Sequence, residues 1–494
     1  MTASPTPPDP DAIPTAPAPN RRRRLWLIAG IIGLLFATIS AVIVYSDAPE
    51  PETSDLAPRR IELADEENFY VQLSRLAKSL NPDDILPYHE PDDLPEGHPA
   101  RMPTGASNSD YDGFSDFLAA GHGWTPARLA KWDARLAQFA SACEALLHLE
   151  KSQAPLPNRI EDLYANHELE RIASQLSVAA GLYWQAGDRQ RALEILATAY
   201  RCGARLTRSS GSLGIYLRGA QLQLVALSCW QRWALADPAA AEAVAGIWRA
   251  CREPEPEENL REAMRAEHHE MSLAISAHED DAAPYGPPAP VLFTWLARTR
   301  VLYPLVYKPN LTRALYADHV RTVIEFTRFD AATYHRRSEE ISLRLEPRDL
   351  LRPVNLYGRM ILSKHDSTRW AAQRRFHYLT EESLFDAVVA LRRYHSRHGE
   401  LPETLATLVP DYLDAVPIDH LDGAPLRYSK GYCAVWSIGP EGIGKPEAPH
   451  PPSRKSLNQR LDFAIPPDTT PITPPPAAPP TAGGSPPRAG SASP

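Results

Sequence analysis

The stretch from Leu25 to Tyr45 constrains the chain most, because it carries no charged residue. It is long enough to cross a hydrocarbon core of roughly 30 Å at about 1.5 Å per residue. Arg21 to Arg24 precede it, and residues 46–55 behind it are acidic with no Lys or Arg. Because basic residues beside a span stay on the cytoplasmic side, the pattern predicts a single-pass signal anchor. We expect a transmembrane helix over residues 25–45 in the inner (cytoplasmic) membrane, with a cytoplasmic N-terminus and the bulk of the chain periplasmic or otherwise extracytoplasmic.

A cleaved signal peptide is the alternative interpretation of this stretch. The apolar region of a signal peptide is usually about 7–15 residues and ends at a small-x-small site. Ser46-Asp47-Ala48 has that form. If the stretch is kept as an anchor, the lipid bilayer is the first expected partner of residues 25–45.

The composition supports a folded middle between two tails. The chain has 494 residues and is 43% hydrophobic, which allows two or three domains at about 100–200 residues each. Its 50 prolines are concentrated toward the ends, where residues 1–20 and 466–494 carry too little apolar surface to fold. The net charge of -9 argues against a nucleic-acid partner.

The same features divide the chain into seven segments. These are a disordered cytoplasmic tail (1–24), the transmembrane helix (25–45), a linker (46–60), an extracytoplasmic α-helical domain (61–345), a connector (346–379), an α+β module (380–465) and a disordered Pro-rich tail (466–494).

The middle of the chain shows helical periodicity. Residues 169–206 predict a helix hairpin with its turn at Gly187-Asp188. The hairpin resembles one tetratricopeptide unit in that turn and in Ala192-Leu193. No repeat near 34 residues continues on either side, so an irregular, solenoid-like stack of helices is expected. The predicted fold class is mainly α, with this stack as the largest part.

The residues that commonly bind metals follow no metal-site spacing. His268-His269 and the stretch from His278 to Asp281 lack the His-Glu-x-x-His pattern, so a solvated helix is expected there, and no metal or cofactor. The chain has five cysteines and no Cys-x-x-Cys motif. Small buried side chains are one interpretation of the cysteines; disulfide pairing outside the cytoplasm, with one thiol left over, is the other. The cysteines are Cys143, Cys202, Cys229, Cys251 and Cys433.

A helix and a strand pair are predicted near the C-terminus. Thr380 has the character of a helix N-cap, with acidic residues in the first turn and basic residues before Gly399. His395 and His398, in those last turns, are interpreted as surface charge. Leu426 to Tyr428 and Tyr432 to Ser437 alternate as paired strands.

Several short motifs in this region match a known family in order and spacing. They are Ala390-Leu391-Arg392-Arg393-Tyr394, His398-Gly399-Glu400-Leu401-Pro402, Leu408-Val409-Pro410, Tyr412-Leu413, Val416-Pro417-Ile418-Asp419, Asp422-Gly423-Ala424-Pro425-Leu426-Arg427-Tyr428 and Ser437-Ile438-Gly439-Pro440-Glu441-Gly442. Over residues 382–442 the chain resembles the soluble domain of the type II secretion system major pseudopilin. The resemblance implies a small α+β module with a calcium loop. Ile443, Lys445 and Pro446 stand where the family is acidic, which removes oxygen ligands that calcium needs; Asp462 is a distant alternative ligand.

No catalytic motif identifies a reaction, so the catalytic residues stay unknown. The first hypothesis is a non-enzymatic, membrane-anchored interaction or assembly component of the bacterial cell envelope, linked to type II secretion through the pseudopilin-like module, with a protein partner. The alternative is an extracytoplasmic hydrolase with a pocket in the helical domain lined by Tyr183, Trp184, Trp230 and the loop of Glu90.

Overall fold

The structure is a computed structural model of the 494-residue chain. It describes residues 21–79, 126–157, 168–252, 256–280, 304, 307–338, 354–364, 367–431, 433–439 and 460–462. The chain divides into two compact units. The first comprises residues 1–52, 278–315 and 344–364, and the second comprises residues 53–277, 316–343 and 365–494.

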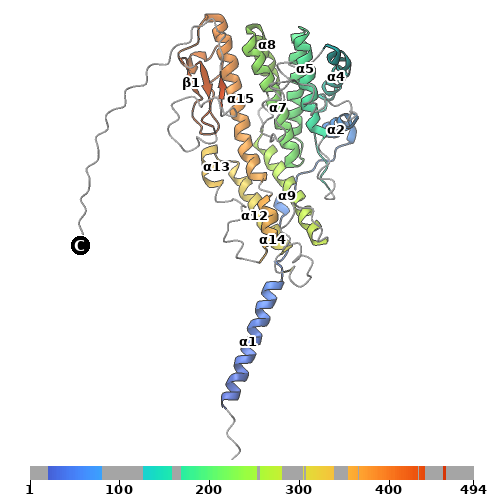
Figure 1. The fold of residues 1–494 in the computed structure, drawn as a ribbon, viewed down its shortest axis with the longest axis vertical. Helices are drawn as coiled ribbons and strands as arrows, with labels where there is room; N and C mark the ends of the chain where they lie inside the picture. Colours follow the sequence, from blue (N-terminus) through green and yellow to red (C-terminus); the bar gives the residue numbers. More distant parts are fainter. Residues whose placement is uncertain are drawn as a thin grey trace, which may run out of the picture. The chain divides into compact units, whose positions relative to one another are not determined.

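The first unit contains helix α1 (Arg21–Tyr45), the start of α12 (Pro309–Phe326) and α14 (Leu356–Lys364) (Figure 1). The described side chains of α1 are those of Trp26, residues 28–38 and Ala41, and they are exposed. None of the helices in the described parts of the chain combines the length and apolar character that crossing a membrane takes. This finding contradicts the predicted transmembrane signal anchor over residues 25–45, and with it the membrane part of the fold class.

Polar contacts within the first unit cap the start of α12. The carboxylate of Asp47 accepts hydrogen bonds from the backbone N–H of Asn310 at 2.8 Å and of Leu311 at 3.3 Å. These amides belong to the first turn of α12, where no helical carbonyl is available to accept from them. Asn355 adopts a φ of 55°, and its Oδ1 accepts from the backbone N–H of Lys308 at 2.9 Å. The predicted linker residue Asp47 is therefore part of a helix cap.

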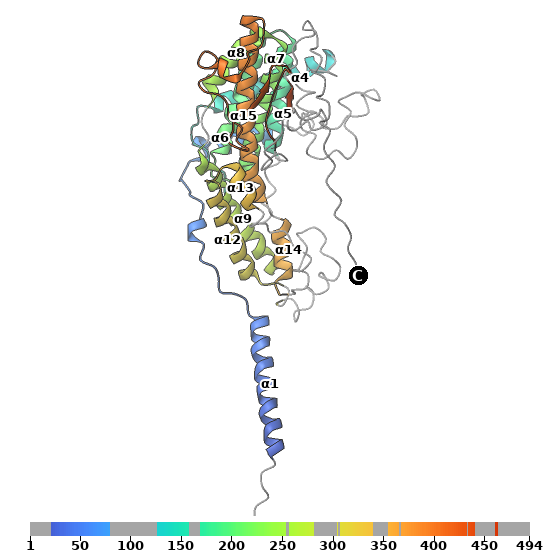
Figure 2. The ribbon, with the colours of Figure 1, turned by 90° about the vertical axis from the view of Figure 1, so that its left-hand side faces the viewer.

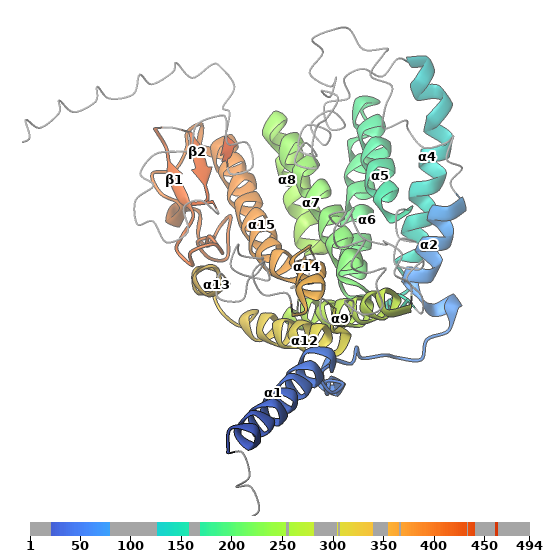
Figure 3. The same ribbon diagram turned by 60° about the horizontal axis from the view of Figure 1, so that its bottom comes forward.

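The second unit is a row of helices with a small sheet at one side (Figures 1 and 3). Its helices are α2 (Phe69–Ser79), α4 (Pro126–Leu146), α5 (Glu168–Gln185), α6 (Arg189–Thr207), α7 (Leu213–Ala236), α8 (Pro238–Cys251), α9 (Glu257–Asp280), the end of α12, α13 (Ala331–Ser338) and α15 (Ser367–His398), with short 3-10 turns at Ser54–Leu56, Asp65–Glu67 and Leu405–Leu408. Neighbours along the chain, from α4 to α8, are also neighbours in space, and α15 packs on α7 and α8. The prediction that the chain is mainly α is confirmed for the described residues.

Local sequence explains where these helices start and stop. Gly187 has a φ of 86°, a left-handed backbone that glycine adopts without a steric penalty. Asp188 follows as the N-cap of α6, and its Oδ1 accepts from the N–H of Arg191 at 3.2 Å. The same device recurs at α8, where Asp237 Oδ1 accepts from Ala239 N at 2.9 Å. The predicted hairpin of residues 169–206, with its turn at Gly187-Asp188, is confirmed as α5 and α6.

Helices α6 and α7 approach each other at two glycines. A Cβ added at Gly203 would lie 2.5 Å from the carbonyl oxygen of Gly219, and one added at Gly219 would lie 2.7 Å from the carbonyl oxygen of Gly203. Neither distance is compatible with a side chain. The two positions therefore fix how closely the two backbones pack.

The C-terminal module is built on α15 and a three-stranded sheet. The antiparallel order is β1 (Arg427–Ser429), β2 (Ala434–Trp436) and β3 (Arg460–Asp462). The predicted strand pair is confirmed, with Tyr428 opposite Val435. Thr380, the predicted N-cap, instead lies inside α15, because buried Ala371, Ala372 and Phe376 extend the apolar face toward Ser367. One helix thus serves both the helical bundle and the module.

Candidate protein-binding surface

Several helix ends meet at one end of the bundle in the second unit. Because α5 to α8 alternate in direction, the C-termini of α5 and α7 lie beside the N-termini of α6 and α8. The C-terminus of α15 reaches the same end beside α8 (Figures 1 and 2). Burial lowers the pKa of Arg392 on α15, and nearby Asp237 at the start of α8 opposes that shift. The end of α15 therefore lies close to the α7–α8 junction.

The first group at this end, the Trp184 pair, consists of two stacked indole rings and an arginine. Trp184 lies 4.3 Å from Trp233 between ring centroids, with an interplanar angle of 2°. The guanidinium of Arg189 lies 5.3 Å from the Trp184 ring and forms an ion pair with Asp237. Trp233 is buried, whereas Trp184 is only half-buried. The result is a rigid aromatic platform with a cation at its edge.

The second group joins α8, the end of α15 and the loop that follows α15 in the chain. We call it the Tyr412 cluster, and it consists of Glu242, Arg393, Tyr394, Arg397, His398 and Tyr412. His398 stacks on Tyr394 with centroids 4.2 Å apart, and its Nε2 lies 3.2 Å from the hydroxyl of Tyr412. The guanidinium groups of Arg393 and Arg397 each lie 5.4 Å from the Tyr412 ring.

Glu242 holds the two arginines of the Tyr412 cluster in place. Its Oε2 accepts from Arg393 Nε at 2.9 Å, and its Oε1 accepts from Arg397 Nη2 at 3.2 Å. The side chain of Arg393 is 11% exposed and that of Arg397 is 56% exposed, so one arginine is a fixed support and the other faces solvent. A partner that approaches this end therefore meets a charged group whose position is already set.

The interior beside this surface is tied together by buried polar groups. Glu382 Oε1 accepts from the hydroxyls of Tyr200 at 2.8 Å and Tyr378 at 2.6 Å. Burial raises the pKa of Glu382, and the two hydroxyl donors oppose that shift. One turn later on α15, Asp386 accepts from Trp248 Nε1 at 2.6 Å. These contacts fix α15 against α6 and α8, and they leave both carboxyls inside the protein.

In the described part of the chain, the residues predicted to line a hydrolase pocket do not come together in one site. Trp230 is fully buried and packs against Tyr200, Trp248 and Phe385 at centroid distances of 6.1, 6.5 and 6.3 Å. Trp184 and Tyr183 are half-buried at the end of α5, and Glu90 lies outside the described residues. Of these residues, Trp184 belongs to the candidate surface and Trp230 to the core.

The histidines occupy different surroundings. The expectation of a solvated helix at His268 is wrong, because His268 is buried in the core, and this burial lowers its pKa to about 4. Nε2 of His269 lies 3.2 Å from the carbonyl of Pro157. The side chains from His278 to Asp281 lie outside the described residues. Among the described residues, no group of three or more His, Cys, Asp or Glu side chains is placed to hold a metal ion. Of the histidine positions singled out in the sequence, His398 is the one that joins the candidate surface.

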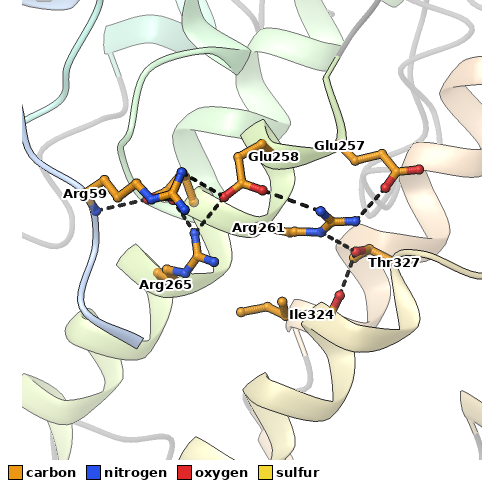
Figure 4. A network of polar contacts seen from close by, with 8 residues as sticks. Arg59, Glu257, Glu258, Arg261, Arg265, Ile324 and Thr327 are labelled. Carbon is orange, nitrogen blue, oxygen red and sulfur yellow. Dashed lines mark hydrogen bonds and ion pairs between the residues drawn. The ribbon is translucent and has the colours of Figure 1, made fainter. Parts of the chain in front are cut away.

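An ionic network at the start of α9 is a second polar cluster, which the sequence did not indicate (Figure 4). Glu258 contacts Arg59, Arg261 and Arg265 at 3.3, 3.4 and 3.0 Å. Arg261 Nε also donates at 3.0 Å to the hydroxyl of Thr327, the residue that follows α12 in the chain. The network holds the extended segment around Arg59 against α9. Since each charge already has an opposite charge beside it, its role is structural.

In the module, an arginine supplies the positive charge beside Asp419. Asp419 is fully buried, and its Oδ2 accepts from Arg427 at 2.7 Å, Ser437 Oγ at 2.9 Å and Ile438 N at 2.7 Å. This network orders the segment that enters β1 and leaves β2. Residues 443–447, which bear on the calcium loop, lie outside the described residues.

Comparisons with known proteins give no relative for this chain. No protein-family model, no curated protein and no solved structure matches it. The resemblance of residues 382–442 to the pseudopilin domain therefore stays a prediction that rests on the sequence motifs, and so does the likeness of the α5–α6 hairpin to a tetratricopeptide unit.

Proposed function

We propose that this chain is a protein-interaction component and that the end of the bundle carrying the Trp184 pair and the Tyr412 cluster is its contact surface. The observation that carries the proposal is the Tyr412 cluster. Trp, Tyr and Arg supply most of the residues that dominate protein–protein binding energy. In the cluster, two tyrosines, two arginines and a histidine from α15 and the loop after it are held together with Glu242 of α8, and Arg397 and His398 are exposed.

The arrangement favours binding of a protein over a merely structural role. Aromatic rings with few rotatable bonds give contact area at little cost in conformational entropy. The arginine fork is planar and can pair with a carboxylate while it stacks on Tyr412. Arg397 already stacks on that ring and keeps more than half of its side chain exposed. A partner side chain could therefore pair with Arg397 without first ordering it.

The experiment compares matched variants of the full chain. Tyr412→Ala removes a half-buried ring of the cluster and Arg397→Ala removes its exposed arginine, whereas Trp370→Ala and Arg201→Ala remove an exposed aromatic and an exposed arginine elsewhere in the same unit. A tagged chain is crosslinked in its native cells, and the recovered partner is titrated against each purified variant. Circular dichroism confirms that the variants fold.

Tyr412→Ala and Arg397→Ala should each weaken binding by about tenfold or more, which corresponds to at least about 1.4 kcal/mol for a residue that dominates an interface. The Trp370 and Arg201 variants should bind as the parent chain does. Equal binding by all four variants, or recovery of the uncrosslinked chain alone, would refute the proposal.

A further inference from the structure

Two exposed arginines lie at the contact surface proposed above, one in each of its two groups. Arg189 comes from α6 and Arg397 from α15, and each keeps 56% of its side chain exposed. Helix α8 packs against both α6 and α15. The surface therefore presents two cations to solvent, and α8 is the neighbour that their helices share.

The surroundings of Arg189 hold it in place. Its guanidinium lies 5.3 Å from the ring of Trp184, which is itself stacked on the buried Trp233. Its Nη1 donates to the carboxylate of Asp237. The other oxygen of that carboxylate accepts from Ala239 N at 2.9 Å, as part of the N-cap of α8. The acid that binds Arg189 is therefore fixed by the helix that it caps.

The surroundings of Arg397 repeat this arrangement. Its guanidinium lies 5.4 Å from the ring of Tyr412, and its Nη2 donates to Glu242 Oε1 at 3.2 Å. Glu242 is on α8, and its other oxygen accepts from Arg393 Nε at 2.9 Å. In both places a ring supports the cation and a carboxylate accepts from one of its N–H groups. Because a guanidinium carries five N–H groups in a planar fork, a second carboxylate can still pair with it.

Positive charge exceeds negative charge among these side chains. Two carboxylates, Asp237 and Glu242, hold three arginines, which are Arg189, Arg393 and Arg397. The five side chains together therefore carry one positive charge. Since the two more exposed arginines are the ones that a partner would meet, the electrostatics of the surface favours a partner with negative charge.

We propose that the partner binds through an extended acidic segment, in which one carboxylate pairs with Arg189 and another pairs with Arg397. This inference rests on the proposed function and describes its partner by chemistry. Asp237 and Glu242 are five positions apart in the chain, which corresponds to a rise of about 7.5 Å along a helix. Carboxylates two to four residues apart in an extended chain are separated by about 7–13 Å, so one short segment can span α8.

An acidic peptide fits this surface better than a nucleic acid does. Asp237 and Glu242 lie directly beside the cations and would repel a chain that carries a negative charge at every residue. The net charge of -9 acts in the same direction. The rings of Trp184 and Tyr412 offer apolar contact to amino-acid side chains that lie between the two carboxylates. Isolated carboxylates with other side chains between them therefore match the arrangement.

The first measurement uses a fluorescently labelled peptide of twelve residues in which Glu and Ser alternate, and a second peptide with Gln in place of Glu. Alternate side chains of an extended peptide share one face, so the Glu residues can reach both arginines. Fluorescence anisotropy with the full chain should show binding of the Glu peptide and at least about tenfold weaker binding of the Gln peptide. Raising the salt from about 50 to 300 mM should weaken binding of the Glu peptide, because exposed ion pairs are screened.

Matched variants of the full chain locate the binding. Arg189→Gln and Arg397→Gln each remove one cation without placing a new charge beside Asp237 or Glu242. Each should weaken binding of the Glu peptide by about fivefold or more, and the double variant should lose more than either, because each arginine pairs with a separate carboxylate. Arg201→Gln removes an exposed arginine elsewhere on α6 and should bind as the parent chain does. Circular dichroism confirms that the variants fold.

Equal binding of the two peptides, or no binding of the Glu peptide at about 1 mM, would overturn the inference. So would equal binding of the Glu peptide by the parent chain and the double variant, or tighter binding of an oligothymidylate of the same length. The proposed function fails by a different result, which is recovery of the uncrosslinked chain alone. A recovered partner that Tyr412→Ala weakens and Arg189→Gln does not would keep the contact surface and reject the acidic segment.

Discussion

The hydrogen bonds of Glu382 give the sharpest test of how the helical bundle is held together. Tyr378→Phe removes one hydroxyl that donates to Glu382 Oε1 at 2.6 Å and leaves the ring in place. A hydrogen bond to a charged group contributes about 1.5–3 kcal/mol, and a neutral one about 1 kcal/mol. Since the Glu382 carboxyl is buried and loses one of its two tyrosine donors, we expect a loss of about 2 kcal/mol in the free energy of unfolding.

The second tyrosine makes the test stricter. Tyr200→Phe removes the other donor, at 2.8 Å, and should cost a similar amount. The double variant leaves the carboxyl without either tyrosine donor, so its cost should exceed the sum of the single costs by about 1 kcal/mol. Tyr183→Phe, a half-buried tyrosine on α5, is the matched control and should change stability by less than about 0.5 kcal/mol.

Urea unfolding followed by tryptophan fluorescence measures these differences, because Trp230 and Trp248 lie in the aromatic core around Tyr200. With a slope of about 2 kcal/mol per molar urea, a loss of 2 kcal/mol lowers the midpoint by about 1 M. If Tyr378→Phe left the midpoint unchanged, or if the double variant were strictly additive, the network would not hold α15 in the way described.

Three further predictions follow from other contacts. Burial, and after it the charge of Glu267, raises the pKa of Glu270 from 4.5 to about 8. The stability that this group contributes is therefore present below pH 4.5 and is lost as the pH rises through 8. Glu270→Gln should flatten that decline in thermal unfolding measured against pH, and an unchanged curve would contradict the shift. Gly203→Ala places a Cβ 2.5 Å from a carbonyl of α7 and should destabilise the unit by about 1–3 kcal/mol in urea unfolding; a neutral result would mean that α6 and α7 separate at little cost. Asp419→Ala removes the buried acceptor of Arg427, Ser437 Oγ and Ile438 N, while Arg427 keeps its ion pair with Asp422. It should cost about 1–3 kcal/mol, seen as faster proteolysis of residues 400–439; unchanged protection would show that the module does not depend on this network.

Local patterns in the sequence predicted local structure well. The turn at Gly187-Asp188, with its cap, and the strand pair around Tyr428 both depend on residues that are close together in the chain. Their signals are a cap, a glycine with positive φ and an alternating apolar pattern, and each acts within a few residues. The helix α15 was predicted to begin at Thr380 and is longer than that, because Thr380 resembles an N-cap in the sequence but does not cap a helix. Its Oγ1 instead accepts from the backbone N–H of His420 at 3.1 Å.

The candidate surface was not predictable in the same way, because its contacts join distant segments. Glu242 and Arg393 are separated by 151 positions, and Tyr200 and Glu382 by 182. Nothing in a single sequence specifies which helices will pack together, so the arginines of α15 could be read only as charges that complement a helix dipole.

The continuity of α15 determines how the proposed surface can work. Its first half packs in the bundle through Phe376 and Tyr378, and its last turns carry Arg393 and Arg397. A hinge between bundle and module would have to break this helix, together with the contacts of Asp386 to Trp248 and of Glu242 to the arginines. Because hydrogen bonds on both sides of the helix oppose that break, the Tyr412 cluster and the bundle move as one body. A partner bound at Tyr412 therefore acts on a preorganised surface, and binding should depend on the groups already presented there and little on rearrangement of the module.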